Sequence, residues 1–152
     1  HENTFLTFFC HYVFNKSFIK KLFANPNQSI ATSKDIISKN DVRCPYENPL
    51  AKQLSGGNLQ KFIIGRSFQV NPKLTIISQP TWGVDIGAAT IIRQKILNLA
   101  SVGKAIIIIS QDLEEIFELS DNICVISNGH LSKIKSKRNM TPTEVGLLMG
   151  VN

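Results

Sequence analysis

The stretch LSGGNLQK, from Leu54 to Lys61, holds residue types that can contact a phosphate group. Two glycines behind a serine let the backbone approach a ligand closely, and the first N–H groups of a following helix present a partial positive charge to an anion. Ser55 adds a hydroxyl donor. A serine before a helix is also a common N-cap without any ligand, so this stretch alone leaves both interpretations open.

The stretch LTIISQPTWGVD, residues 74–85, is a second place where chemistry is expected. Its apolar run ends in Ser78 and Gln79, and it looks like the active strand of a nucleotide enzyme in which two acidic residues have been replaced by neutral ones. An amide cannot accept the proton of an attacking water, so these residues lack the chemistry of a general base. The plain alternative is that both are polar residues that close a strand.

Alternating strand and helix patterns around these two stretches predict an α/β fold. The apolar runs Leu74–Ile77 and Ala105–Ile109 predict strands that are buried on both faces of a parallel sheet. A third strand is predicted at Asn122–Ser127, turning at Asn-Gly into Leu131–Ile134. The predicted helices are Ser29–Asn40 with Ser29 as its cap, Ser55–Val70, Ile86–Ala100, Leu113–Leu119, and a last helix with Pro142 in its first turn.

Composition narrows the class of protein but does not identify it. The 152 residues, 43% of them hydrophobic, suffice for one domain with a core. The net charge of +6 favours anionic partners without choosing between nucleotides, nucleic acid and a lipid surface. Three cysteines without Cys-x-x-Cys spacing favour a reducing cytosol over a zinc site or a disulfide framework.

The ends and the apolar runs of the chain bear on its location. The longest apolar runs fall far short of the roughly 20 residues that span a bilayer, so no membrane helix is expected. The N-terminal HENTFLTFF has no initiator methionine, basic leader or cleavage site, as expected of a chain that begins within a longer protein.

Three stretches together resemble the second half of an ATP-binding-cassette (ABC) ATPase domain. They are LSGGNLQK, NPKLTIISQPTWGVD and IIIISQDLEEIFELSDNICVISNG, which stand in the order and spacing of that family over about residues 50–135. In the family, the first is the signature motif, the strand ending at Ser78 is Walker B, Pro80–Asp85 leads through the D-loop, and Ser110–Asp112 holds the switch histidine position. The segments QPTWGVDIGA and TEVGLLMG look most like the C-terminal cassette of tandem-cassette importers for nucleosides and sugars.

This resemblance implies a partial ABC ATPase domain of three-layer α/β architecture, made of the helical subdomain and the C-terminal half of a RecA-like core with a parallel sheet. Residues 1–53 would be part of the variable helical subdomain, and residues 54–135 would hold the signature motif, the Walker B-like strand, the D-loop and the switch region. Residues 136–152 would form a C-terminal helix and tail. Without the strands that precede this part of a cassette, the sheet is expected to expose an edge and an apolar face.

Three departures from the family's pattern argue against hydrolysis at the chain's own site. Ser78 replaces the Asp that holds the water shell of Mg²⁺, Gln79 replaces the Glu that polarises the attacking water, and Gln111 replaces the switch His. A positioned general base contributes roughly a hundredfold to ten-thousandfold in rate. The chain also contains no GxxxxGK[ST] phosphate loop. We therefore expect no intact catalytic residue and no metal ligand within the chain.

The resemblance still implies a role for the signature motif, because cassettes of this family pair head to tail. Each ATP then lies between the phosphate loop of one cassette and the signature motif of the other, together with Mg²⁺, so a composite site is expected here. Asp85 is expected at the cassette interface, as part of the D-loop. The residues expected to face the ATP of a partner cassette are Leu54, Ser55, Gly56, Gly57, Asn58 and Gln60.

The first functional interpretation is an ATP-binding subunit, or a part of one, that energises an importer of nucleosides or sugars. Its partners would be a second cassette and membrane permease subunits, with no nucleic acid, and it would lie in the cytoplasm on the inner face of the cell membrane. A second interpretation is a truncated, non-catalytic cassette that acts as an interaction or regulatory module, or a gene remnant. A third interpretation is an ABC-type protein that acts on nucleic acid or the ribosome. The replaced acidic pair argues against it, because those relatives keep the acidic pair.

Other features carry open alternatives. Trp82 stands where the family often has a basic residue, so it is either a dimer-interface side chain or an ordinary surface or core aromatic. Residues 8–21 mix aromatics with lysines, as nucleic-acid binders do, although contact with a permease is the first expectation. The basic run Lys133–Arg138 is expected to be a solvated strand end rather than an anion-binding patch.

Overall fold

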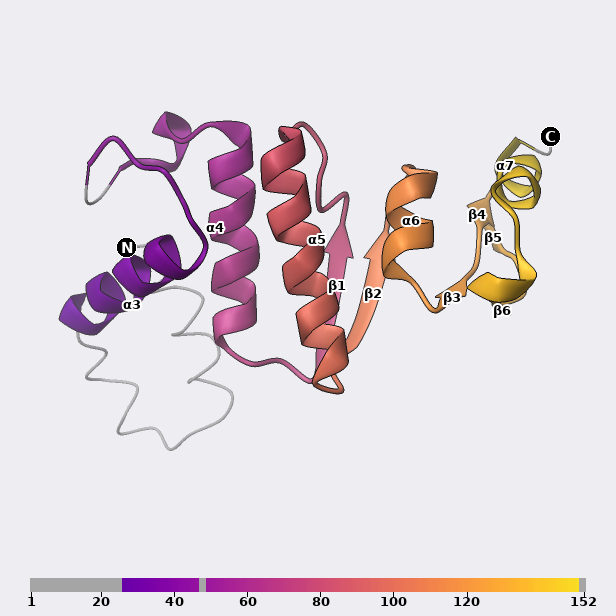
Figure 1. The fold of residues 1–152 in the computed structure, drawn as a ribbon, viewed down its shortest axis with the longest axis horizontal. Helices are drawn as coiled ribbons and strands as arrows, with labels where there is room; N and C mark the ends of the chain where they lie inside the picture. Colours follow the sequence, from indigo (N-terminus) through magenta and orange to yellow (C-terminus); the bar gives the residue numbers. More distant parts are fainter. Residues whose placement is uncertain (1–25, 47–48, 151–152) are drawn as a thin grey trace.

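The computed structural model describes residues 26–46 and 49–150 (Figure 1). The aromatic and lysine-rich segment at residues 8–21 lies outside the described residues. The helices are α3 (Pro26–Lys39), α4 (Gly56–Gln69), α5 (Ile86–Ser101), α6 (Leu113–Leu119) and α7 (Pro142–Gly150), with 3₁₀ turns at Ala51–Gln53 and Lys137–Asn139. The strands are β1 (Leu74–Ser78), β2 (Ala105–Ile109), β3 (Asn122–Ile123), β4 (Ile126–Ser127), β5 (His130–Leu131) and β6 (Lys135–Ser136).

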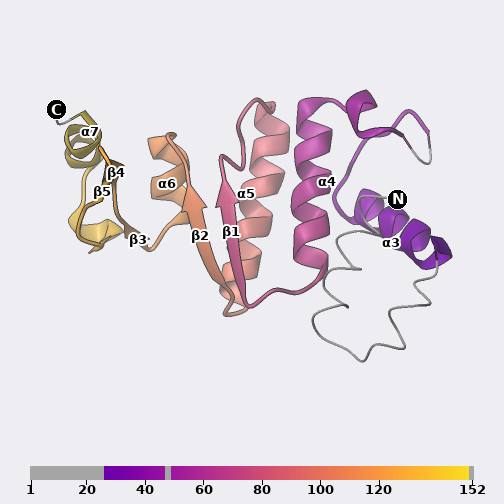
Figure 2. The ribbon, with the colours of Figure 1, turned by 180° about the vertical axis from the view of Figure 1, so that it is seen from behind.

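A parallel pair of strands, β1 and β2, forms the centre of the described fold and confirms the α/β class. The register runs from Leu74 opposite Ala105 to Ser78 opposite Ile109, and α5 connects the two strands. Helices α4, α5 and α6 gather on one face of this pair (Figures 1 and 2). The core on that face is built from Ile64, Ile92, Ile96 and Leu119, against which Ile77, Ile106 and Ile108 of the strands pack.

The opposite face of β1 and β2 is apolar and has no described element over it (Figure 2). Ile76 is 62% exposed and its register partner Ile107 is 48% exposed. The prediction that both strands are buried on both faces is therefore wrong for the described residues, which hold two of the three expected layers. The prediction of an uncovered apolar face is confirmed. Side chains alternate along a strand, so every second residue of these apolar runs points away from the helices.

A paired substitution on this open face tests its character. We expect Ile76→Thr with Ile107→Thr to reduce binding of an apolar dye and aggregation of the chain, while the free energy of unfolding changes by no more than about 0.5 kcal/mol. Threonine keeps the β-branched shape that strands favour. The matched control is Ile77→Thr with Ile108→Thr, the next register pair, which packs inward. Equal destabilisation by the two pairs in urea titrations would show that the open face is buried in solution.

The prediction of one continuous third strand at Asn122–Ser127 is wrong, because the structure has two short strands, β3 and β4, in this segment. β3 pairs antiparallel with β6, and β4 pairs antiparallel with β5. Between them, the N–H of Val125 donates to Ser132 Oγ at 2.9 Å, so a side chain replaces a ladder bond. The Asn-Gly turn is confirmed, with positive φ values of 49° at Asn128 and 78° at Gly129. The strand predicted at Leu131–Ile134 contributes only Leu131 to β5, which begins at His130.

The helix boundaries agree with the sequence patterns except in α3. That helix begins at Pro26, so Ser29 lies within it and is not its cap. Proline is favoured in the first turn because the N–H that it lacks has no partner there. At α7, Thr141 Oγ1 accepts from the N–H of Glu144 at 3.2 Å, and the N–H of Thr141 donates to Glu144 Oε2 at 2.7 Å. This capping box supports the start of α7 predicted from Pro142.

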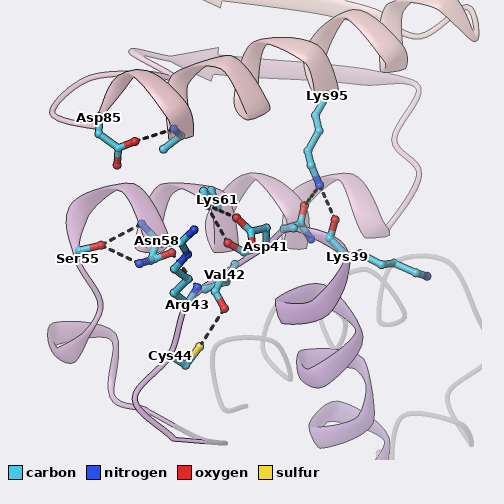
Figure 3. A network of polar contacts seen from close by, with 12 residues as sticks. Lys39, Asp41, Val42, Arg43, Cys44, Ser55, Asn58, Lys61, Asp85 and Lys95 are labelled. Carbon is cyan, nitrogen blue, oxygen red and sulfur yellow. Dashed lines mark hydrogen bonds and ion pairs between the residues drawn. The ribbon is translucent and has the colours of Figure 1, made fainter.

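Two lysines hold the C-terminal end of α3 against α4 and α5 (Figure 3). Lys61 Nζ donates to the carbonyl of Asp41 at 2.8 Å and to Asp41 Oδ2 at 3.1 Å. Lys95 Nζ donates to the carbonyl of Lys39 at 2.9 Å and to Asn40 Oδ1 at 2.5 Å. The last carbonyls of a helix lack partners within the helix and carry partial negative charge, so cations are favourable there. The segment after α3 is thereby fixed beside α4.

Candidate functional site

The glycine turn (Ser55, Gly56 and Gly57) lies at the start of α4, with Ser55 as the N-cap (Figure 3). Ser55 Oγ accepts from the backbone N–H of Asn58 at 3.4 Å and from Asn58 Nδ2 at 2.9 Å. Both bonds use the oxygen as acceptor, so the hydroxyl proton is left for a further acceptor. Ser55 and Gly56 are exposed. The N-cap and the phosphate contact are therefore compatible in one residue.

Both glycines lie where the turn closely approaches the start of α5 and the segment before it. A Cβ atom at Gly56 would lie 3.3 Å from the carbonyl oxygen of Gly83. A Cβ atom at Gly57 would lie 3.3 Å from Ala88 Cβ and 3.4 Å from Asp85 Oδ2. The structure thus brings the glycine turn and Asp85 together, although the two motifs are well separated in the sequence.

Asp85 is the N-cap of α5 and carries a fixed negative charge beside the glycine turn. Its Oδ1 accepts from the N–H of Ala88 at 2.9 Å. This hydrogen bond, opposed by partial desolvation, holds the pKa of Asp85 below its ordinary value. The nearby charge of Lys61 acts in the same direction. Asp85 is exposed, at the place where an interface contact is predicted.

Ser78, Gln79 and Gln111 lie at the carboxyl edge of the parallel strands. Ser78 is the last residue of β1, and Gln79 follows it directly. Gln111 lies two residues after the end of β2. Gln79 has a φ of 51°, which is strained for a residue other than glycine and costs about 1–3 kcal/mol. Its N–H donates to the carbonyl of Ile109 at 2.7 Å. The backbone at Gln79 is thus held in a special conformation, at the position where the sequence resemblance predicts a replaced catalytic Glu.

Gln60 has a partner within the chain. Its Nε2 donates to the carbonyl of Gln79 at 3.2 Å, and the same carbonyl accepts from the N–H of Trp82 at 3.2 Å. The amide therefore links α4 to the carboxyl edge of β1. Trp82 itself is 74% exposed, which excludes the core alternative for this residue.

Sequence reasoning missed a buried contact between the loop that follows β1 and helix α6. Thr81 Oγ1 donates to Glu115 Oε1 at 2.6 Å, and Glu115 is only 1% exposed. The N–H of Glu115 also donates to Asp112 Oδ1 at 3.2 Å, which is the N-cap bond of α6. The Asp-x-x-Glu spacing signals that cap, but no local signal points to Thr81. The loop that carries Gln79 is therefore tied to the helix that follows Gln111.

The donors at the carboxyl edge do not fit a metal ion held by this chain. Mg²⁺ prefers carboxylates and water, whereas Ser78 and Gln79 offer a neutral hydroxyl and a neutral amide. Within residues 26–46 and 49–150, no three His, Cys, Asp or Glu side chains lie close enough together to bind a metal. In the same ranges, no helix has the length and apolar character needed to cross a bilayer.

Comparison with curated proteins finds relatives among import ATP-binding proteins, while no protein-family model matches the chain. The chain is 44% identical over 117 residues to the guanosine import ATP-binding protein NupO of Bacillus subtilis, covering 77% of this chain and 23% of that protein. It is 40% identical over 127 residues to the nucleoside import ATP-binding protein NupA of Lactococcus lactis, covering 84% and 25%. The ribose import ATP-binding protein RbsA of Clostridium tetani is 39% identical over 127 residues, covering 84% and 25%. The chain spans about a quarter of the length of these relatives.

Comparison with solved structures gives the same fold. A nucleotide-free ATP-binding cassette from an ABC transporter superposes with a TM-score of 0.66 at 24% identity, covering 90% of this chain and 58% of that one. A dimeric ATP-binding cassette in a post-hydrolysis state with ADP and phosphate superposes with a TM-score of 0.64 at 20% identity, covering 76% and 50%. The described residues therefore correspond in fold to about half of each of these chains.

Proposed function

We propose that this chain donates its signature motif to ATP held by a partner cassette. The chain has the fold of part of an ABC ATPase domain and is similar in sequence to nucleoside and sugar import ATP-binding proteins. The observation that carries this proposal is the glycine turn, where Ser55 is exposed and has its hydroxyl proton free of the N-cap bonds. A phosphate is a suitable acceptor for this proton, because the partial positive charge at the start of α4 also attracts an anion.

The chain's residues fit an anionic group at the glycine turn. Ser55 supplies a hydroxyl donor, and the N–H groups of Gly56 and Gly57 belong to the first turn of a 14-residue helix. Those N–H groups lack carbonyl partners within the helix. When bound, ATP with Mg²⁺ supplies the reacting phosphoryl group, and the chain's part is to orient and stabilise its charge. The phosphate loop and the acidic pair would come from the partner cassette.

The chain's own half-site is proposed to be degenerate. Ser78, Gln79 and Gln111 are neutral at the positions of the metal-shell Asp, the general-base Glu and the switch His. None of these side chains supplies the charge or the proton acceptor that ATP hydrolysis uses. In a pair of cassettes, one composite site would thus hydrolyse ATP and the other would not.

The similar proteins indicate the setting of this activity. Three of them are named for import of guanosine, nucleosides and ribose. We extend this to the present chain as import of a nucleoside or sugar through membrane permease subunits. The chain would then lie in the cytoplasm, peripheral on the inner face of the cell membrane, with a second cassette as its direct partner.

A second candidate function is that of a non-catalytic interaction or regulatory module. The same neutral residues, Ser78 and Gln79, favour it, since a cassette without its acids can still associate. The two functions differ at Ser55. A partner's ATP turnover depends on the Ser55 hydroxyl only if the signature motif acts in the active site.

Association in the presence of nucleotide tests the proposal. We expect the chain to form a one-to-one complex with an intact cassette that carries its own phosphate loop when ATP is present, and to separate from it in ADP, because the γ-phosphate joins the two surfaces. Light scattering after size exclusion measures the mass of the complex. The control is the same cassette with the lysine of its phosphate loop replaced by alanine. An equal mass in ATP and in ADP would contradict a nucleotide-bridged pair.

A further inference from the structure

We infer that Asn58 is a positioning residue that orients the Ser55 hydroxyl as a donor toward a phosphate, an inference that rests on the proposed function. The motif alone places Asn58 among residues that face ATP. The structure instead gives both ends of its amide a partner within the chain (Figure 3). Asn58 is half-buried, whereas Ser55 is exposed. Its effect on a nucleotide would therefore pass through Ser55.

The backbone N–H of Arg43 determines which end of the amide faces Ser55. It donates to Asn58 Oδ1 at 2.9 Å. Rotating the amide by half a turn would place the NH₂ group of Asn58 against this N–H, with two donors facing each other. The NH₂ group is therefore held toward Ser55 Oγ, at 2.9 Å.

The polarity of the bond decides what the Ser55 hydroxyl can do. A serine hydroxyl has one proton to donate and two lone pairs to accept with. Asn58 supplies a donor from its backbone N–H and a second donor from its side chain, and both point at the oxygen. The proton is then the only part of the hydroxyl left without a partner from Asn58, and a phosphate oxygen is an acceptor that suits it.

The same bonds make Ser55 sensitive to the segment that follows α3. Arg43 lies two residues after Asp41, which Lys61 of α4 holds at 3.1 Å. A shift of this segment relative to α4 would move the Arg43 N–H and release the amide of Asn58. The orientation of the Ser55 hydroxyl would then be lost together with the fixed position of α3.

Two substitutions of Asn58 separate the roles of its amide. Asn58→Asp keeps an acceptor for the Arg43 N–H but replaces the donor that faces Ser55 with an acceptor, which draws the Ser55 proton to itself. Asn58→Ala removes both groups. Each variant of the 152-residue chain is made with Ser55 and with Ser55→Ala, and is mixed with an intact cassette that carries a phosphate loop. The readouts are the ATP turnover of the mixture, the dissociation constant of the ATP-dependent complex and the hydrogen-exchange rate of the Arg43 amide.

We expect Asn58→Asp to lower turnover and weaken the complex about as much as Ser55→Ala does, by roughly tenfold to a hundredfold. Asn58→Ala should have a smaller effect, about threefold to tenfold, because the free hydroxyl still samples the donating orientation. Exchange of the Arg43 amide should accelerate in Asn58→Ala and not in Asn58→Asp. In the Ser55→Ala background, neither substitution should change turnover or affinity by more than about twofold, as coupled residues are non-additive.

The outcomes distinguish this inference from the proposed function. If Ser55→Ala is without effect, the proposed function and the inference both fail. If Ser55→Ala acts but the Asn58 variants do not, only the inference fails. If Asn58→Asp is equally harmful with and without the Ser55 hydroxyl, its charge repels the phosphate directly and the positioning role is overturned.

Discussion

Replacing Ser55 with alanine is expected to lower the ATP turnover of a partner cassette mixed with this chain by about tenfold to a hundredfold, because a hydrogen bond to a charged group contributes about 1.5–3 kcal/mol. The substitution removes the one hydroxyl that is exposed at the start of α4 and has its proton available. The expected loss concerns the partner's site, since the chain's own Ser78 and Gln79 offer no acid. Steady-state turnover at saturating ATP measures it.

Two further variants separate this loss from a loss of helix stability. Ser55 is also an N-cap, and its replacement by alanine costs about 0.5–2 kcal/mol of stability. Ser55→Thr keeps both the capping oxygen and the hydroxyl proton, so it should restore most of the turnover. Ser67→Ala, on the same helix, removes a hydroxyl that donates to the carbonyl of Ile63 at 2.9 Å and should leave turnover unchanged. A Ser55→Thr chain as inactive as Ser55→Ala would contradict the role of the hydroxyl.

The second large effect is on stability: Gly65→Ala is expected to lower the free energy of unfolding by about 2 kcal/mol, although alanine normally favours a helix. A Cβ atom at Gly65 would overlap the amide group of Asn40. Asn40 is only 6% exposed, donates to the carbonyl of Ile36 at 2.6 Å and accepts from Lys95, so it cannot move without losing bonds. Urea titration of the chain measures the change.

The matched control for Gly65 is Gly146 in α7, where an added Cβ atom would meet nothing within 4 Å. Gly146→Ala should raise the free energy of unfolding by about 0.5–1 kcal/mol through helix propensity alone. A combined Gly65→Ala and Asn40→Ala chain should be less destabilised than the sum of the two changes, because the overlap disappears. Similar effects of alanine at Gly65 and Gly146 would contradict the close packing of α3 on α4.

Local patterns in the sequence were sufficient for the elements around the site. The β-branched run Leu74–Ile77 predicts β1, and Ala105–Ile109 predicts β2 residue for residue, because unbroken apolar runs of this length are typical of parallel strands. Ser55 and Asp85 both precede apolar periodicity and both are N-caps in the structure. The start of α3 was missed because a proline three residues before Ser29 begins the helix instead.

Contacts between distant segments could not be predicted in the same way. The bond from Thr81 to the buried Glu115 spans 34 residues, and nothing in either segment marks the other as its partner. The acceptor of the Gln60 amide is a backbone carbonyl, which every residue carries, so its position depends on the fold alone. The break between β3 and β4 arises from the Ser132 side chain and from pairing with two different strands, neither of which alters the apolar pattern of Asn122–Ser127.

The proposal that a cassette without its own acids completes the active site of another cassette is tested most directly by ATP turnover in three samples. These are the chain alone, an intact cassette with a phosphate loop alone, and an equimolar mixture of the two. We predict no turnover by the chain alone and a rate in the mixture well above that of the intact cassette alone. A mixture whose rate equals the sum of the separate rates would contradict the donation of the glycine turn to a partner's ATP.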